Sequence, residues 1–232
     1  MLKTQIKTVI DASRTRGWVS EPDAKRLLAT AGLTVPRFTT VTDPGQVQSA
    51  AESLGFPLAA KVVSSRILHK SDHGGVETGI TTTEELAAVF ERFGRLDGFE
   101  AMLVEEMVSG LELIFGGKID DQFGPVVMLG MGGTGVEIYQ DISLRMAPVS
   151  PEDVASMITC LKSARLLSGY RGGVVVNRDE LIRTLICFSE FFMAVAEMIE
   201  SIDLNPVMCS AERCVVADAR IMLPSANGFK TP

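Results

Sequence analysis

The sequence of 232 residues contains few histidines and cysteines, and it has no long apolar run. No apolar segment reaches the roughly 18–20 residues that a membrane-spanning helix needs, and the N-terminus is too polar for a signal peptide. These absences predict a soluble, cytoplasmic protein. The cysteines form no C-x-x-C pair and have no nearby histidine, which favours buried reduced thiols over a metal site or a disulfide. They are Cys160, Cys187, Cys209 and Cys214.

The charge balance also limits the class of partner. The chain has 22 basic and 29 acidic residues, a net charge of −7, and no arginine-rich tract stands out. Nucleic-acid-binding proteins usually carry a basic patch, so nucleic acid is not an expected partner. A hydrophobic content of 46% is typical of a globular protein with a real core, and the length fits one large domain or two small lobes.

Strand and helix patterns alternate irregularly along the chain, and several predicted strands follow one another directly. Such adjacent strands favour an α+β fold of two lobes over a single doubly wound sheet. A lobe boundary is expected near residues 107–110. We predict strands at 58–64, 75–80, 100–107, 111–119, 125–129, 201–207 and 214–219, with an extended segment at 137–147. Helices are predicted after Ser20, from Asp43 to Leu54, and at 84–92, 151–162 and 179–200.

Both histidines fall in one segment, residues 60–76, in which an apolar, β-branched run precedes a polar loop. Lys61 supplies a positive charge there, and Gly74 and Gly75 end the loop. Backbone N–H groups of a glycine-bearing loop can close around phosphate oxygens, and a neutral imidazole can accept a phosphoryl group. The segment therefore indicates nucleotide phosphate chemistry with a covalent step at one of its two histidines, His69 or His73. The alternative is an ordinary strand followed by a solvated loop.

Two further groups of polar residues are candidates for binding. Alternation along residues 202–206 puts Asp203 and Asn205 on one face, and a hairpin with residues 215–220 would bring Asp218 close. Carboxylate and amide oxygens suit Mg²⁺, although polar residues at hairpin ends are also common. Three glutamates near strand ends could contact adenine or the ribose hydroxyls: Glu105, Glu106 and Glu112. The alternative is that they are ordinary solvated residues, as most acidic residues at strand ends are. The turn at residues 131–135 is rich in glycine and could face a substrate.

Taken in order, five segments resemble the ATP-grasp subunit of NDP-forming acyl-CoA synthetases, and most closely the beta subunits of ADP-forming acetate–CoA ligases. The matching segments are Ile67–Val76, Gln122–Gly133, Gly169–Gly172, Ile202–Val207 and Val216–Ile221. The resemblance covers residues 18 to 223, and the combination is specific although no single segment is. It implies an ATP-grasp domain over 18–232, with nucleotide between two lobes. One lobe would span 36–106, the other 18–35 and 107–232, and residues 1–17 would form an arm or helix.

The resemblance also implies roles for individual residues. Lys61 matches the lysine that contacts the ATP phosphates, and the glycine pair belongs to the loop that covers them. The backbone of Glu105, Glu106 and Met107 matches the adenine-binding hinge, and Glu112 a ribose-contacting carboxylate. Asn205 and Asp218 match the magnesium ligands, with Asp203 close by. His69 matches a histidine that relays phosphate between ADP and a phosphohistidine on a CoA-binding alpha subunit, in an α2β2 assembly.

The sequence departs from the family pattern at His73, where an apolar or small residue is usual, and at Glu105, where glutamine is common. His73 is therefore a candidate to modify or compete with His69. The expected reaction is acyl-CoA + ADP + phosphate ⇌ carboxylate + CoA + ATP, with acid and CoA handled mainly by the partner. Two alternatives are an ATP-grasp ligase joining a carboxylate to an amine, and a non-catalytic, nucleotide-binding regulatory subunit.

Overall fold

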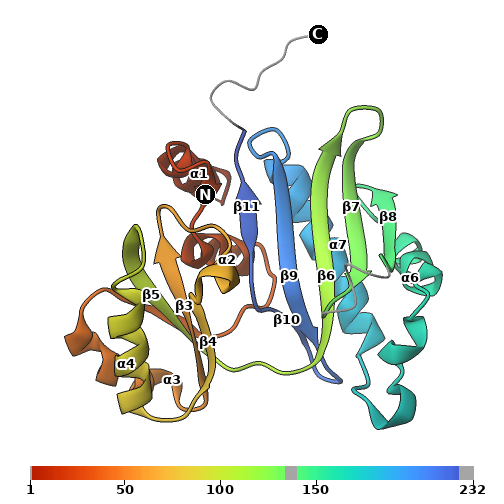
Figure 1. Cartoon of the computed structure of the whole chain (residues 1–232). Coiled ribbons are helices and arrows are strands. Elements are labelled where there is room, and N and C mark those ends of the chain that lie inside the picture. The colour runs from red at the N-terminus through yellow and green to blue at the C-terminus, as the bar shows by residue number, and fades with distance from the viewer. Residues whose placement is uncertain (1, 134–139, 225–232) are drawn as a thin grey trace. The chain divides into compact units, whose positions relative to one another are not determined.

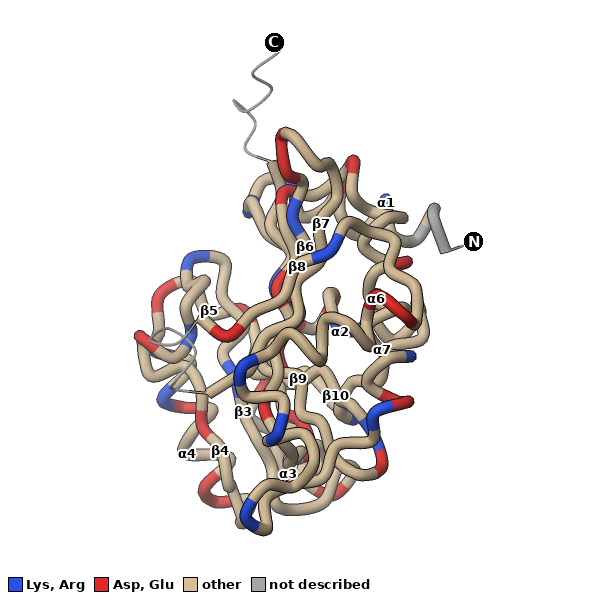
Figure 2. The backbone as a smooth tube through the Cα atoms, turned by 90° about the vertical axis from the view of Figure 1, so that its right-hand side faces the viewer, with Lys and Arg blue, Asp and Glu red and all other residues tan. Residues whose placement is uncertain are grey.

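The computed structural model describes residues 2–133 and 140–224, and it divides the chain into two compact units (Figure 1). One unit comprises residues 36–108, and the other comprises residues 1–35 and 109–232. Basic and acidic positions are interspersed along the backbone of both units (Figure 2). None of the helices in the described residues has the length and apolar character that crossing a bilayer requires.

The unit of residues 36–108 is a four-stranded antiparallel sheet with two helices. Its strand order is β2-β5-β3-β4. Apolar residues of both helices form a core with Ala60, Val62, Met102 and Val104 on one face of the sheet. Lys61 and Glu105 are therefore directed to the opposite face. The elements are β2 (Phe38–Val41), α3 (Val47–Leu54), β3 (Leu58–Ser64), β4 (Val76–Ile80), α4 (Thr83–Phe93) and β5 (Phe99–Glu106).

The larger unit contains a seven-stranded antiparallel sheet whose strand order is β1-β11-β9-β6-β7-β8, with β10 pairing only β9. Its strands are β1 (Trp18–Val19), β6 (Leu111–Asp120), β7 (Gly124–Met131), β8 (Ile142–Met146), β9 (Ser201–Cys209), β10 (Cys214–Val216) and β11 (Arg220–Met222). Its helices are α1 (Leu2–Ser13), α2 (Glu21–Thr30), α6 (Pro151–Cys160) and α7 (Arg178–Val195).

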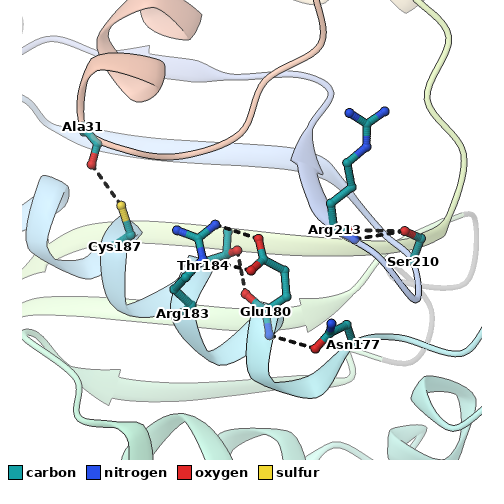
Figure 3. A network of polar contacts seen from close by, with 8 residues as sticks. All are labelled: Ala31, Asn177, Glu180, Arg183, Thr184, Cys187, Ser210 and Arg213. Carbon is teal, nitrogen blue, oxygen red and sulfur yellow. Dashed lines mark hydrogen bonds and ion pairs between the residues drawn. The ribbon is translucent and has the colours of Figure 1, made fainter.

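Sequence signals for helix ends explain where these helices begin. Ser20 caps α2 by accepting a hydrogen bond from the Asp23 N–H, and Ser150 and Asp153 form a capping box at α6. Asn177 caps α7, whose first turns are also held by the Glu180–Arg183 ion pair (Figure 3). The helices thus start at polar residues that satisfy their first N–H groups.

Helix α7 packs its phenylalanines against the sheet, and Gly117 of β6 allows the close approach. Phe188 and Phe192 are fully buried in the core of this unit. A Cβ atom added at Gly117 would lie 2.8 Å from Ile202 Cγ2 and 2.9 Å from Phe192 Cδ2. The opposite face of β6 and β9 carries the polar residues Glu112, Lys118 and Asp203.

The last helix is shorter than predicted, and the end of the predicted range belongs to the sheet instead. The sequence predicts a helix over 179–200, but α7 ends at Val195. The Glu200 N–H donates to the Met222 carbonyl of β11 at 2.8 Å, so the chain has already joined the sheet there. Helical periodicity cannot reveal that competing partner.

The predicted strand at 214–219 is too long: β10 ends at Val216, residues 217–219 are not strand, and β11 begins at Arg220, beyond the predicted range. The short edge strands β1 and β2 were not predicted at all; β1 has two residues, and β2 has only one buried residue among four. Strands this short carry too few residues for a period to be recognised.

The prediction of buried thiols is wrong for Cys160, which is exposed, and only partly right for Cys187, which is half-buried. Cys209 and Cys214 are fully buried and face each other across β9 and β10. A hydrogen bond with Cys214 and burial raise the pKa of the Cys209 thiol. All four cysteines are free of disulfides.

The close approach at Gly117 predicts a position-specific effect on stability. Gly117→Ala should lower the free energy of unfolding by about 1–3 kcal/mol, because backbone and core atoms must shift to admit the methyl group. The neighbouring Gly116→Ala is the control, since its added Cβ meets mainly the flexible Met128 Cε, at 3.0 Å. Urea denaturation of both variants checks this, and equal losses would contradict it.

Candidate functional site

Lys61 and Glu105 form a buried ion pair on the face of the smaller sheet that is opposite its helices. Lys61 Nζ lies 2.7 Å from Glu105 Oε1, and the two side chains are 9% and 3% exposed. Glu105 lies opposite Ala59 in the β3–β5 register, so Lys61 is its diagonal neighbour on the same face. A phosphate that binds this lysine must therefore share it with a carboxylate.

His69 lies in the loop between β3 and β4, which turns back onto β3. Its imidazole is exposed, and within the described part of the chain it makes no hydrogen bond or ion pair. Gly74 has a φ of +64°, and a Cβ added at Gly75 would lie 2.5 Å from Val62 Cγ1. The glycine pair thus fixes the loop against the residue that follows Lys61.

The N–H groups of this glycine pair are engaged inside the loop. The Gly74 N–H donates to the Ser71 carbonyl at 3.2 Å, and the Gly75 N–H donates to the Lys70 carbonyl at 2.8 Å. The glycine pattern predicts that such N–H groups close around phosphate oxygens. In this conformation they shape the loop instead, and a phosphate would have to displace these bonds.

Glu106, the last residue of β5, forms an ion pair with Arg37. Arg37 Nε lies 2.8 Å from Glu106 Oε2, and Arg37 Nη2 donates to the Leu54 carbonyl at 2.8 Å. The backbone N–H of Glu106 donates to the Arg37 carbonyl, and that of Met107 to the Pro57 carbonyl at 3.3 Å. Glu106 thus anchors the end of the strand that presents the predicted hinge.

In the larger unit, Asp203 lies between Arg220 of β11 and Gly116 of β6 in the register of the sheet. Burial raises the pKa of the Asp203 carboxyl, the charge of Arg220 lowers it, and the nearby charge of Asp218 raises it. The net direction is upward, so this carboxylate is held in an environment that disfavours its charge.

Asn205 and Asp218 come together where the pairing of β9 is interrupted. The Pro206 carbonyl accepts hydrogen bonds from the N–H groups of Ala217 at 3.0 Å and Asp218 at 3.4 Å. Asp218 therefore lies beside the Asn205–Pro206 step, and its Oδ1 accepts the Ala219 N–H at 2.8 Å. The side chain of Asn205 is exposed.

The only metal ligands that Asp203, Asn205 and Asp218 can offer are oxygen atoms. In the described ranges there is no group of three or more His, Cys, Asp and Glu side chains that could hold a metal ion. Two carboxylates with an amide oxygen fit Mg²⁺, which binds proteins through one or two carboxylates and takes other ligands from water and phosphates. They do not fit a structural zinc site, which needs nitrogen or sulfur ligands.

Glu112 is exposed on β6 and lies close to the glycine pair Gly132 and Gly133. The Gly132 N–H donates to the Glu112 carbonyl at 2.7 Å, and a Cβ at Gly132 would lie 2.7 Å from the Cβ of Glu112. Gly133 has a φ of +84°. The predicted glycine-rich turn thus begins over Glu112, while its remainder, from residue 134, lies outside the described residues.

The candidate residues fall into two groups, one in each unit. The smaller unit holds Lys61, His69, Gly74, Gly75, Glu105, Glu106 and Met107, and the larger holds Glu112, Asp203, Asn205 and Asp218. Two arginines near these groups are not predicted from the sequence: Arg37 forms an ion pair with Glu106, and Arg220 lies opposite Asp203 in the sheet. Arg220 stands in one of the matching segments, but only the strand register shows its partner.

A family model described as an ATP-grasp domain matches residues 11–223. The chain belongs to the ATP-grasp family. The predicted family and fold are thereby confirmed.

Two curated relatives illustrate what the chain is similar to. The beta subunit of the ADP-forming acetate–CoA ligase I from Pyrococcus furiosus is 34% identical over 211 residues, which cover 88% of this chain and 90% of the relative. The ADP-forming 4-hydroxybutyrate–CoA ligase from Nitrosopumilus maritimus is 32% identical over 215 residues, but the match covers only 30% of that longer protein.

A solved structure is also similar over nearly all of the chain. It is the dinucleotide-forming acetyl-coenzyme A synthetase 1 from Ca. Korarchaeum cryptofilum, in complex with coenzyme A and Mg-AMPPCP, with a phosphohistidine segment pointing towards the nucleotide-binding site. The TM-score is 0.82 at 32% sequence identity, and the match covers 96% of this chain and 100% of the other.

The buried pair of Lys61 and Glu105 predicts a large loss of stability when only one partner is removed. Lys61→Met should lower the free energy of unfolding by about 3–5 kcal/mol, because it leaves a buried carboxylate without its neighbouring ammonium group. The double variant Lys61→Met/Glu105→Leu should recover most of that loss. Urea denaturation of the single and double variants checks this; simple additivity of the losses would count against the pair.

The environment of Asp203 predicts a pH-dependent effect of its removal. Because the folded-state pKa is raised, the stabilising protonated form is lost as pH rises from about 3.9, the ordinary value, through the folded-state pKa. Without metal, Asp203→Asn should therefore melt at a higher temperature than the wild type at pH 7. The difference should close as the pH falls towards the unfolded-state pKa. Thermal melts in EDTA between pH 4 and 8 check this, and a pH-independent difference would refute it.

Proposed function

We propose that this chain is the ATP-grasp, or beta, subunit of an ADP-forming acyl-CoA synthetase. The net reaction is acyl-CoA + ADP + phosphate ⇌ carboxylate + CoA + ATP. The observation that carries the proposal is the exposed His69, which has no hydrogen-bond partner among the described residues and lies in a loop packed against β3 beside Lys61. The 34% identity to a beta subunit of an acetate–CoA ligase supports the choice of reaction.

His69 acts as a phosphate relay in this proposal. One of its imidazole nitrogens attacks the phosphorus of a phosphohistidine on the partner subunit, so that a new N–P bond forms as the partner's N–P bond breaks. A terminal oxygen of ADP then attacks the same phosphorus, and the bond to His69 breaks as ATP forms. The exposure of the loop suits a group that must meet two other molecules in turn.

The remaining candidate residues bind and orient the nucleotide. Lys61 neutralises phosphate charge, and Glu105 holds its ammonium group in position at 2.7 Å. The hinge at Glu105, Glu106 and Met107 receives adenine, and Glu112 receives the ribose. Asp203, Asn205 and Asp218 would hold Mg²⁺, which when bound offsets charge on the transferring phosphoryl group.

The domain assignment belongs to the same proposal. Residues 18–232 form the ATP-grasp domain, in which the lobe of residues 36–106 supplies Lys61 and the 66–75 loop and the other lobe supplies the metal ligands. The carboxylic acid and CoA are handled mainly by a CoA-binding alpha subunit in an α2β2 heterotetramer. The assembled enzyme would act in the cytoplasm.

Intact-protein mass spectrometry after incubation with Mg·ATP tests the relay. The wild type should gain one acid-labile phosphoryl group, since a phosphoramidate hydrolyses in acid. His69→Gln should lose this adduct completely. His73→Gln is the matched control from the same loop, and it should retain the adduct.

A parallel incubation includes a cognate alpha subunit, so that the absence of a partner cannot explain a negative result. No adduct on the beta chain in either incubation would refute the proposal, and so would an adduct that persists in His69→Gln. A carboxylate–amine ligase would keep full activity in His69→Gln, and a regulatory subunit would bind nucleotide without ever becoming phosphorylated.

A further inference from the structure

A cavity of about 480 Å³ lies in the larger unit, and none of the candidate residues of the proposed function lines it. Its walls come from α6, from a short 3₁₀ helix at Ala164–Leu167, from the segment before α7 and from the first turn of α7. Cavities of roughly 300–1,000 Å³ are typical of small-molecule sites. The size alone therefore permits a ligand.

The floor of the cavity is apolar and belongs to the core of the unit. Ile158, Leu167, Val176 and Leu181 all line it, and each is at most 9% exposed. An apolar body placed there would be removed from water, which is favourable in proportion to the area covered. Thr159 and Ser168 also line the cavity.

Two arginines line the same cavity without a counter-charge. Neither Arg165 nor Arg178 makes an ion pair or side-chain hydrogen bond within the described residues. By contrast, Arg183, five residues after Arg178 on α7, contacts Glu180 at 2.6 Å (Figure 3). The acidic partners available on α7 thus leave the cavity arginines unneutralised.

Arg178 is also placed where helix stability disfavours it. It is the first residue of α7, and cations are unfavourable at the positive end of a helix dipole. The next two residues, Asp179 and Glu180, are acidic, as that position normally requires. An anion bound in the cavity would offset the unfavourable interaction of Arg178 with the helix dipole.

The local sequence reinforces the positive charge. Residues 154–178 contain no aspartate or glutamate, although the whole chain has a net charge of −7. The same stretch carries Lys162, Arg165, Arg171 and Arg178. An acid-free stretch of this length in an acidic protein favours anion binding at its surface.

One wall of the cavity is fixed before any ligand binds. Ser168 and Val175 form a β-bridge, and the Val176 N–H donates to the Leu167 carbonyl at 2.8 Å. Gly169, with a φ of +76°, closes this turn, since a Cβ there would lie 2.7 Å from Val175 Cγ2. A preformed wall reduces the entropy lost on binding.

We propose that this cavity binds an amphiphilic oxyanion, a carboxylate or phosphate carried on a short apolar body. The guanidinium groups of Arg165 and Arg178 bind the oxyanion, and the apolar body covers Ile158, Leu167 and Leu181. This assignment does not depend on the acyl-CoA synthetase function, because binding is measurable without turnover.

Isothermal titration calorimetry of the whole chain, at fixed ionic strength, tests the proposal. Hexanoate and hexyl phosphate are the probes, acetate and inorganic phosphate supply the charge alone, and 1-hexanol supplies the apolar body alone. At least one hexyl anion should bind saturably and at least tenfold more tightly than its head group or 1-hexanol. The tighter of the two hexyl anions identifies the head group.

Single variants locate the site. Arg165→Gln and Arg178→Gln should each raise the Kd of the tighter probe about tenfold or more, as expected for loss of a charge-assisted hydrogen bond. Arg183→Gln is the matched control, because it removes one positive charge from the same helix without lining the cavity. Thr159→Trp, which fills the cavity, should abolish binding while circular dichroism and the melting temperature report that the protein is folded.

Three results would overturn the proposal. In the first, neither hexyl anion binds saturably to the wild type. In the second, acetate or inorganic phosphate binds as tightly as the corresponding hexyl anion. In the third, the variants of Arg165, Arg178 and Arg183 all raise the Kd equally. The first excludes a ligand site of this chemistry, and the other two indicate attraction by general surface charge only.

Discussion

Pro206 has no backbone N–H, and the pairing of β9 is interrupted where it stands. Before the interruption, β9 pairs with β11; after it, β9 pairs with β10. The Pro206 carbonyl instead accepts hydrogen bonds from the N–H groups of Ala217 and Asp218. This change of partner places Asp218 beside Asn205, so the proposed metal-binding group depends on a proline that a regular ladder would exclude.

The Lys61–Glu105 pair imposes a second constraint, which concerns energy rather than position. Removing two charges from water is costly, and their attraction offsets that cost only while both are present. A lysine held 2.7 Å from a buried carboxylate is already fixed in place when a phosphate arrives. The proposed phosphate-binding group is therefore preorganised, although the anion must compete with Glu105 for its charge.

The sequence reveals those features that lie within one continuous segment. The strand at 58–64 is predicted with the bounds of β3, because a continuous apolar, β-branched run has few alternatives. The end of α7, the strands β1 and β11, and the partners of Arg37 and Arg220 could not be predicted. Each depends on a contact between segments far apart in the chain. The glycine pair at 74–75 is an intermediate case, since its position in a loop is predicted but the partners of its N–H groups are not.

Several charged side chains form ion pairs that stabilise the fold, but two lie in environments that disfavour their charge. Arg183 and Arg37 are each neutralised by a glutamate, as are Lys61 and Lys25, the latter fully buried on α2 at 3.0 Å from Glu21. Burial instead raises the pKa of the Asp203 carboxyl and so disfavours its charged form, and Arg178 opposes the dipole of its helix. Local conflicts of this kind persist in natural proteins mainly where a ligand resolves them. A cation beside Asp203 would stabilise its charged form, and an anion beside Arg178 would offset its interaction with the helix dipole. At both proposed sites, therefore, a bound ion of opposite charge would remove a local electrostatic conflict.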